Sequence, residues 1–156
     1  MIQLSNVNFK YSNSQSGALK DISITIHEGE CILLCGDSGC GKTTITRLIN
    51  GLIPHFYDGE RTGSVKVADM DVSKEEIYTI SKRVGSVFQN PRSQFFCLDT
   101  SSELAFGCEN LGMPVEQINE RIEHVVREVE LENLVDRDIF KLSGGEKQRI
   151  ACGSVA

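Results

Sequence analysis

The sequence has no apolar stretch long enough to span a lipid bilayer, and its N-terminus lacks the basic and apolar regions of a secretory signal. We therefore expect a protein that is cytosolic or that reaches a membrane through a partner. Lysine and arginine form no cluster, and the chain of 156 residues has a net charge of −6. Because binding along a nucleic acid needs a basic surface, we expect no nucleic-acid partner.

Metal-binding and disulfide patterns are also missing. None of the six cysteines forms a C-x-x-C pair, and the three histidines are isolated. Cys31, Cys35 and Cys40 lie in or beside a glycine-rich loop whose backbone a disulfide would distort. We therefore interpret all six cysteines as reduced, small apolar residues, and we expect neither a disulfide framework nor a zinc site.

What is present is the composition of one soluble globular domain, with 40% apolar and 24% charged residues and no internal repeat. Alternating apolar residues over 2–11, with one slip between Leu4 and Val7, predict a strand that contains a bulge. The polar turn of residues 12–17 separates it from a second alternating strand at 22–26. We expect the two strands to pair as an antiparallel layer.

The most informative stretch is a glycine-rich loop over residues 36–43, which reads G-D-S-G-C-G-K-T. The apolar run of residues 31–35 before it predicts a buried core strand, and the pattern from Lys42 to about Asn50 after it predicts a helix. Glycines let the backbone N–H groups point inward at the start of that helix, where the helix dipole also favours an anion. We therefore predict a phosphate-binding loop in an α/β core, with a plain glycine-rich turn as the alternative.

Several residues of this loop have an expected role toward ATP and Mg²⁺. Lys42 would bridge the β- and γ-phosphates, and the hydroxyl of Thr43 would coordinate the Mg²⁺ that these phosphates carry. Thr44 is expected to add a contact to the α-phosphate. The other residues expected to hold the phosphates are Gly36, Ser38, Gly39, Cys40 and Gly41.

The chain beyond this loop alternates between predicted strands and helices. Residues 63–67 predict a short strand, Ser73 with Glu76 predicts the capping box of a brief helix, and residues 83–89 predict a second core strand. Apolar residues from 115 to 129 keep helical spacing on one face, with glutamates mostly on the other. This pattern predicts a surface helix that packs on one side.

A second motif near the C-terminus reads L-S-G-G-E-K-Q-R over residues 142–149. Ser143 is a natural N-cap, and Gly144 and Gly145 leave backbone N–H groups free at the start of the next helix, which makes a second anion site. A capped helix without a ligand is the alternative. The octapeptide resembles the signature motif of the ATP-binding-cassette (ABC) ATPases, in which it follows a phosphate loop in the same order as here.

The resemblance implies an α/β fold with a P-loop NTPase core, an N-terminal antiparallel β layer and a helical subdomain. The β layer and P-loop core would span residues 1–94, and the helical subdomain residues 95–156. Two such domains pair head to tail in this family, with ATP between the phosphate loop of one and the signature motif of the other. Ser143 and Gly145 would therefore act in trans on the γ-phosphate.

The resemblance also assigns roles to residues outside the two motifs. Tyr11 resembles the aromatic residue that stacks on adenine, and an aromatic side chain packed in the core is the alternative. Gln89 resembles the glutamine that approaches Mg²⁺ and the attacking water and that links the site to a transmembrane partner. The catalytic roles thus fall on Gln89, Lys42 and Ser143.

Two longer segments, residues 89–96 and 103–112, resemble the corresponding parts of energy-coupling-factor importers, the cobalt and vitamin class. This implies an ATP-binding subunit on the cytoplasmic face of the membrane. It would couple MgATP binding and hydrolysis to the uptake of a metal ion or vitamin through transmembrane subunits. Because the substrate binds a separate membrane subunit in that class, these residues do not name it.

One departure from the family pattern concerns hydrolysis. No apolar run in the sequence ends in Asp-Glu. The family places its Mg²⁺-binding aspartate, catalytic glutamate and switch histidine in a C-terminal third that this sequence lacks. A truncated nucleotide-binding fragment without hydrolysis is therefore one alternative.

Two further alternatives come from other classes of nucleotide-binding protein. A non-transport ABC ATPase that acts on DNA carries a long coiled coil between the two motifs, and the spacing from Lys42 to Ser143 leaves no room for one. In a P-loop kinase or GTPase, the second motif would be accidental. Both alternatives explain less of the sequence than an ABC transporter ATPase does.

Overall fold

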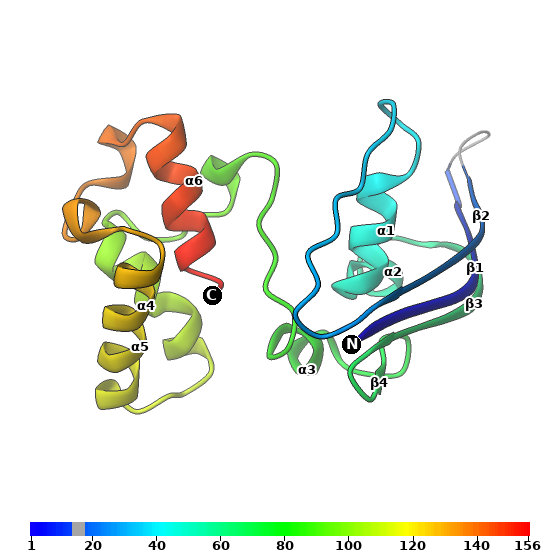
Figure 1. Ribbon diagram of the computed structural model, residues 1–156, viewed down its shortest axis with the longest axis horizontal. Helices are drawn as coiled ribbons and strands as arrows, with labels where there is room; N and C mark the ends of the chain where they lie inside the picture. Colours follow the sequence, from blue (N-terminus) through cyan, green and yellow to red (C-terminus); the bar gives the residue numbers. More distant parts are fainter. Residues whose placement is uncertain (14–17) are drawn as a thin grey trace. The chain divides into compact units, whose positions relative to one another are not determined.

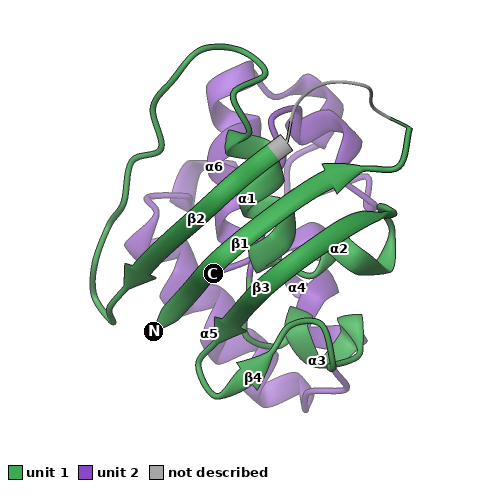
Figure 2. Ribbon diagram, turned by 90° about the vertical axis from the view of Figure 1, so that its right-hand side faces the viewer, with its two compact units in different colours: residues 1–84 green, residues 85–156 purple. Residues whose placement is uncertain are grey.

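The computed structural model describes residues 1–13 and 18–156, and it divides the chain into two compact units (Figures 1 and 2). Unit 1 is Met1–Val84 and unit 2 is Gly85–Ala156. Each unit contains its own cluster of buried apolar residues. The boundary after residue 94 that the resemblance implies concerns the parts of the family's domain, and it stays a prediction.

Unit 1 is built on an antiparallel sheet with the strand order β2-β1-β3-β4, drawn in green in Figure 2. Its strands are β1 (Ile2–Tyr11), β2 (Ala18–Ile26), β3 (Gly59–Val67) and β4 (Met70–Asp71). The predicted pairing of β1 with β2 is confirmed, and so is the bulge, since the register shifts between Leu4 and Val7. The turn expected over residues 12–17 lies partly outside the described residues. The strand predicted at 63–67 forms the second half of β3.

Helices cover one face of this sheet. They are α1 (Lys42–Ile49), α2 (Leu52–His55) and α3 (Ile77–Ser81), of which α1 and α2 lie across the strands in Figure 2. The helix predicted after the glycine loop is confirmed as α1, whose Leu48 is fully buried. The core between the layers comprises Leu4, Val7, Phe9, Leu19, Leu48, Ile53, Val65, Val67, Val72 and Ile80. This packing fixes the start of α1, and with it the end of the glycine loop, against the sheet.

The two core strands predicted before the glycine loop and near residue 89 are absent. Residues 31–35 and 84–88 have no regular secondary structure, and Leu33 and Phe88 are 83% and 48% exposed. A strand needs a neighbouring strand to satisfy its backbone N–H and C=O groups, and no described strand pairs with either segment. Their apolar composition is typical of buried strands, but the other described parts of the chain leave most of these residues exposed. Both predictions are therefore wrong for this structure.

The capping box predicted from Ser73 and Glu76 is also wrong. The hydroxyl of Ser73 donates to Asp71 Oδ1 at 2.7 Å, and α3 begins only at Ile77, with Glu76 as its N-cap. Because the first helical residue is Ile77, Ser73 lies outside the cap position, and its side chain bonds Asp71 instead. This hydrogen bond also lowers the pKa of Asp71 below its usual value.

Unit 2 consists of short helices around a second core. Its elements are η1 (Pro91–Ser93), α4 (Thr100–Asn110), α5 (Val115–Glu128), η2 (Glu132–Leu134), η3 (Ile139–Lys141) and α6 (Gly144–Gly153). The buried core residues are Leu104, Val125, Leu131, Leu134, Leu142 and Ile150. The surface helix predicted over 115–129 is confirmed as α5, which buries Ile118 and Val125. Val115, at the N-terminal end of α5, is 72% exposed and does not belong to the packed face.

All six cysteines are free thiols in the structure, and their interpretation as reduced residues stays a prediction. Their interpretation as apolar packing residues holds for Cys108, which is buried, whereas Cys31, Cys35, Cys40 and Cys152 are exposed. Burial, and next the nearby carboxylate of Glu103, raise the pKa of the Cys97 thiol, which therefore stays protonated at neutral pH. Over residues 1–13 and 18–156, no helix has both the length and the apolar character needed to cross a bilayer.

Candidate functional site

The glycine loop takes a backbone path that only glycine follows easily. Gly36, Gly39 and Gly41 have φ angles of +146°, +82° and +103°. A Cβ at Gly41 would lie 2.5 Å from Leu19 Cδ2, and one at Gly36 would lie 2.8 Å from Cys40 Sγ. The positive φ angles therefore favour glycine at these positions, and a larger residue at Gly36 or Gly41 would also have to displace a neighbouring side chain.

The start of α1 presents free hydrogen-bond donors. Gly41 is the N-cap and offers no side-chain oxygen, while its carbonyl accepts from Ile45 N at 3.0 Å. The N–H groups of residues 42–44 therefore have no intrahelical acceptor, and α1 has no acidic residue in its first turn. Together with the helix dipole, these donors form a site that favours an anion.

Lys42 holds the loop closed. Its Nζ donates to the carbonyl oxygens of Gly36 and Asp37, each at 2.7 Å, and lies 3.5 Å from Cys40 Sγ. An ammonium has three N–H donors, and the two carbonyls take two of them. The third donor, which faces only the weakly accepting sulfur, is available to a phosphate without opening the loop.

The hydroxyl groups of α1 differ in their surroundings. Thr43 is exposed, and its hydroxyl makes no hydrogen bond within the described residues. Thr44 Oγ1 lies 3.2 Å from the hydroxyl of Tyr11, and Thr46 Oγ1 donates to the carbonyl of Thr43 at 2.9 Å. The hydroxyl of Thr43 is thus free of contacts within the described residues, and its predicted role as a ligand of Mg²⁺ stays a prediction.

Tyr11 belongs to an aromatic cluster beside α1. Its ring lies 4.8 Å from that of Phe9 in an edge-to-face arrangement, and its hydroxyl accepts from Arg47 Nη1 at 3.1 Å. The guanidinium of Arg47 also lies 4.0 Å from the ring centroid of Tyr57. These contacts favour the packing interpretation of Tyr11, and its stacking on adenine stays a prediction.

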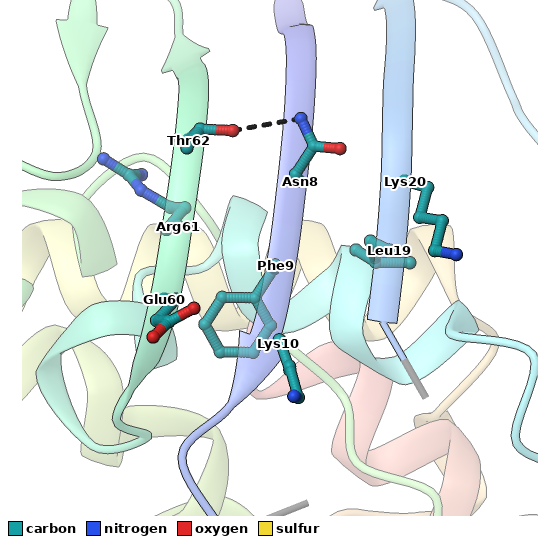
Figure 3. A pocket seen from close by; sticks show the side chains of 8 residues that line it. All are labelled: Asn8, Phe9, Lys10, Leu19, Lys20, Glu60, Arg61 and Thr62. Carbon is teal, nitrogen blue, oxygen red and sulfur yellow. Dashed lines mark hydrogen bonds between the residues drawn. The ribbon is translucent and has the colours of Figure 1, made fainter. Parts of the chain in front are cut away.

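A hollow of about 440 Å³ lies on the sheet and is lined by none of the loop residues (Figure 3). Its lining residues are Asn8, Phe9, Lys10, Leu19, Lys20, Glu60, Arg61 and Thr62, none of which the sequence predicted as a site residue. Lys10 stands opposite Glu60 in the strand register, and Asn8 Nδ2 donates to Thr62 Oγ1 at 3.0 Å. The buried Nη1 of Arg61, by contrast, has no hydrogen-bond partner within the described residues. None of the lining residues belongs to the glycine loop or to the second motif, so we do not place the candidate nucleotide site in this hollow.

The signature motif forms the capped start of α6. The Oγ of Ser143 accepts from Glu146 N at 3.3 Å, and Glu146 Oε2 accepts from Ser143 N at 2.7 Å. Sequence reasoning identified Ser143 as the cap but missed its reciprocal partner, although the S-x-x-E spacing carries that signal. The hydrogen bonds from Ser143 lower the pKa of Glu146, which helps to keep it ionised at neutral pH. The capping box therefore weakens only in acid, as the pH falls through this lowered pKa.

The two glycines of this motif have open space beside them. A Cβ built on Gly144 or on Gly145 would meet nothing within 4 Å, and neither glycine has a positive φ. Within the described residues, neither backbone conformation nor packing therefore requires glycine here. The cap uses one lone pair of the Ser143 oxygen, so its hydroxyl hydrogen is available to an external acceptor. Behind the motif, the buried Lys147 donates to the carbonyl of Leu142 at 2.7 Å and fixes the turn.

Gln89 lies in the segment that leads into η1. It is exposed and makes no hydrogen bond within the part of the chain that the structure describes. It belongs to unit 2, whereas the glycine loop belongs to unit 1, so its approach to the metal and water stays a prediction. Sequence reasoning missed two neighbours that shape this segment: Gln94, which accepts from Phe88 N, and the buried Glu103, which accepts from Phe96 N and Cys97 N. Nothing in the sequence marks such contacts between a side chain and a distant backbone group.

The donor set fits a triphosphate better than it fits a bare metal ion. The loop amides and Lys42 suit an anion, and Thr43 offers one oxygen to a cation that the anion carries. No group of three or more His, Cys, Asp or Glu residues suited to a metal ion occurs among residues 1–13 and 18–156. In nucleotide sites Mg²⁺ is usually bound by one or two carboxylates together with the phosphates, so such a cluster is not required.

Comparison with known proteins supports this assignment. A family profile described as ABC transporter matches residues 19–155. A Treponema denticola protein, whose name places it among ABC transporter ATP-binding proteins, is 54% identical over 99% of this chain and 32% of its own length. The energy-coupling factor transporter ATP-binding protein EcfA1 of Ligilactobacillus salivarius is 37% identical over 99% of this chain and 53% of its own. The chain thus spans about a third to a half of these curated relatives.

Two solved structures share the fold. CbiO1 from Clostridium perfringens, described as part of the ABC transporter complex cbiONQ, matches with a TM-score of 0.84 and 26% identity over 99% of this chain and 60% of its own. The ATP-binding cassette MJ0796, described as a dimer in a post-hydrolysis state bound to ADP and Pi, matches with a TM-score of 0.78 and 25% identity. The match covers 99% of this chain and 68% of the MJ0796 chain. The predicted P-loop NTPase fold is therefore confirmed. Because the profile match includes both the glycine loop and the capped start of α6, the chain belongs to the ABC transporter family.

Proposed function

We propose that this chain is the ATP-binding part of an importer ATPase, which couples MgATP binding and hydrolysis to uptake through a membrane partner. The observation that carries the proposal is the glycine loop, which Lys42 holds closed. The backbone N–H groups in the first turn of α1, which follows the loop, have no intrahelical acceptor. Because the chain spans only part of its relatives, the activity and partners of the whole protein belong to the proposal.

At the loop, we propose that the first-turn amides of α1 and the third N–H of Lys42 bind the phosphates. Phosphoryl transfer needs chiefly positioning and neutralisation of the charge on the phosphate oxygens, and these groups provide both. Mg²⁺, when bound, neutralises β- and γ-phosphate charge, and the free hydroxyl of Thr43 is the ligand that this chain offers it. Thr44 and Tyr11 share a hydrogen bond beside this site, and we retain both as proposed nucleotide contacts.

At the signature motif, we propose that Ser143 and Gly145 bind the γ-phosphate held by the loop of a second ATPase domain. The space around Gly144 and Gly145 supports this, since no residue of the described chain uses it and a close ligand would require it. The dimeric state described for MJ0796 is consistent with such a pairing. In this arrangement Ser143 supplies its hydroxyl hydrogen while its oxygen still caps α6.

We propose an importer of the energy-coupling-factor class on the cytoplasmic face of the membrane. The resemblance of residues 89–96 and 103–112 to that class supports it, as does the similarity to EcfA1 over 99% of the chain. Gln89 would link the nucleotide site to the transmembrane subunits, and it would orient the attacking water. A cobalt ion or a vitamin is the proposed class of cargo, which would bind the membrane partner.

Replacing Lys42 with alanine tests the nucleotide site. We expect MgATP binding to the complete protein to weaken by at least about tenfold, or about 1.4 kcal/mol, because the substitution removes the loop closure and one phosphate contact. Titration calorimetry measures this affinity, and Lys66→Ala on exposed β3 is the matched control with the same loss of charge. Equal affinity of Lys42→Ala and wild type would refute the assignment.

Replacing Phe96 tests the contact with the membrane partner. Phe96 is 76% exposed and stacks on Phe106 with ring centroids 4.9 Å apart, whereas Phe95 packs against the core of unit 2. We expect Phe96→Ser to reduce pull-down of the transmembrane subunit by about tenfold or more without unfolding unit 2, since an exposed apolar surface of this kind marks a binding site. Phe95→Ser should instead lower the melting temperature.

The control for this experiment is Val115→Ser, which removes an equally exposed apolar side chain from α5. If Phe96→Ser and Val115→Ser pull down the same amount of transmembrane subunit, Phe96 is not part of the surface that binds this subunit.

A further inference from the structure

The segment that bears Gln89 is closed by a side chain. Gln94 Oε1 accepts from Phe88 N at 3.0 Å, so the residues from 88 to 94 form a ring. Inside the ring, Asn90 Oδ1 accepts from Arg92 N at 3.1 Å, and Gln94 N donates to the carbonyl of Pro91 at 3.0 Å. Gln89 is therefore placed between two held positions, although its own side chain is free to meet a ligand.

The chain after this ring is anchored to α4. Phe96 N and Cys97 N both donate to Glu103 Oε2, each at 2.9 Å. Glu103 is 3% exposed and is part of the rigid helix α4. A buried carboxylate that accepts two backbone N–H groups is costly to displace, so the path of the chain at Phe96 follows α4.

Gln94 connects these two held regions. It is two residues from Phe96 and bonded to the residue before Gln89, and it is not a member of the apolar core of unit 2. Its side-chain carbonyl joins the entry of the ring, at Phe88, to its exit. Without this acceptor, Phe88 would be free to rotate, and Gln89 would no longer be held in one orientation relative to Phe96.

We propose that Gln94 is a positioning residue for Gln89. It fixes the Gln89 backbone relative to the segment that carries Phe96, so that within unit 2 these two residues keep one relative orientation. The inference rests on the proposed function, in which Gln89 orients the attacking water. It assigns no contact between Gln94 and ATP, so the affinity of the glycine loop in unit 1 does not depend on it.

The test compares substitutions that keep or remove the acceptor. In the complete protein reconstituted with its membrane partner, Gln94→Met keeps the length of the side chain but loses the carbonyl, and turnover of ATP should fall by about tenfold. Gln94→Glu keeps an acceptor oxygen at the same place and should restore turnover to near the wild-type rate. The affinity for MgATP should stay within about twofold of wild type in both variants. Gln117→Met on exposed α5 is the matched control.

A double-mutant cycle separates positioning from a loss of stability. If Gln94 acts through Gln89, Gln94→Met should lower turnover no further once Gln89→Ala is present, because the group it positions is gone. If the double variant loses the product of the two single-variant losses in turnover, the proposal is wrong. It is also wrong if Gln94→Met turns over ATP as fast as wild type. If the methionine variant does not fold, Gln94→Asn, which shortens the side chain by one methylene, should show the same loss and the same non-additivity.

This result is distinguishable from failure of the proposed function. If wild-type turnover is undetectable, or is unchanged by Lys42→Ala, both the ATPase assignment and the role of Gln94 are wrong. If turnover depends on Lys42 and Gln94→Met leaves it unchanged, only the role of Gln94 is wrong.

Discussion

Residues 1–156 on their own are expected to bind MgATP but to hydrolyse it at least about a hundredfold more slowly than the complete protein. Binding requires the glycine loop and α1, both of which are formed within these residues. Hydrolysis also requires a group that activates water and a carboxylate that holds Mg²⁺ beside Thr43. The resemblance to the ABC ATPases implies that both groups lie on a strand that follows the signature helix, which is why we expect little turnover from residues 1–156 alone.

The same fragment is expected to self-associate. Ile32 and Leu33 are 49% and 83% exposed, and the segment 31–35 has no strand neighbour in the described chain. An apolar segment with unpaired backbone groups is a template for pairing with another copy. Light scattering of the fragment against the complete protein measures this tendency.

Phosphate release measures the turnover of the fragment and of the complete protein side by side. Lys42→Ala in each protein gives the background, and calorimetry shows whether the fragment still binds MgATP. Comparable turnover by the two proteins, abolished by Lys42→Ala, would place the catalytic carboxylate within residues 1–156 and would refute our alignment of the motifs.

Gly145→Asp is expected to lower turnover of the complete protein by about a hundredfold or more while the fold is retained. Gly145 is the second residue of α6, and an aspartate in the first turn of a helix stabilises it by about 0.3–1 kcal/mol. The open space around Gly145 admits the new side chain without a clash. The carboxylate would, however, repel the γ-phosphate that we propose binds there.

This substitution also tests whether the motif acts in trans. If Gly145 contacts the nucleotide of a second domain, Gly145→Asp should leave MgATP affinity at its own glycine loop unchanged while turnover is lost. The matched control is Gln117→Asp, which puts the same charge into the first turn of α5. If Gly145→Asp turns over ATP at the wild-type rate, the signature motif does not contact the nucleotide. If the affinity for MgATP falls together with turnover, the motif contacts the nucleotide bound by its own domain.

Features that depend on neighbours in the chain could be predicted from the sequence. The left-handed glycines of the loop, the start of α1 and the cap of α6 by Ser143 are set by local conformation and by hydrogen bonds within about four residues. The one-sided packing of α5 follows from the spacing of its apolar residues, which places them on one face of any helix. The candidate phosphate loop and signature motif therefore needed no tertiary information.

Features that depend on distant residues were decided only by the tertiary structure. Residues 31–35 have the composition of a core strand, but a strand forms only where another strand accepts its hydrogen bonds, and none does so in the described chain. Phe95 and Phe96 are identical neighbours in the sequence, yet Phe95 packs against the core of unit 2 and Phe96, whose backbone N–H donates to the buried Glu103, is exposed. Sequence by itself thus determined the local anion-binding elements of this protein, because their hydrogen bonds close within a few residues. The pairing of strands and the path of the segment that carries Gln89 depend on contacts between distant residues, which only the folded chain brings together.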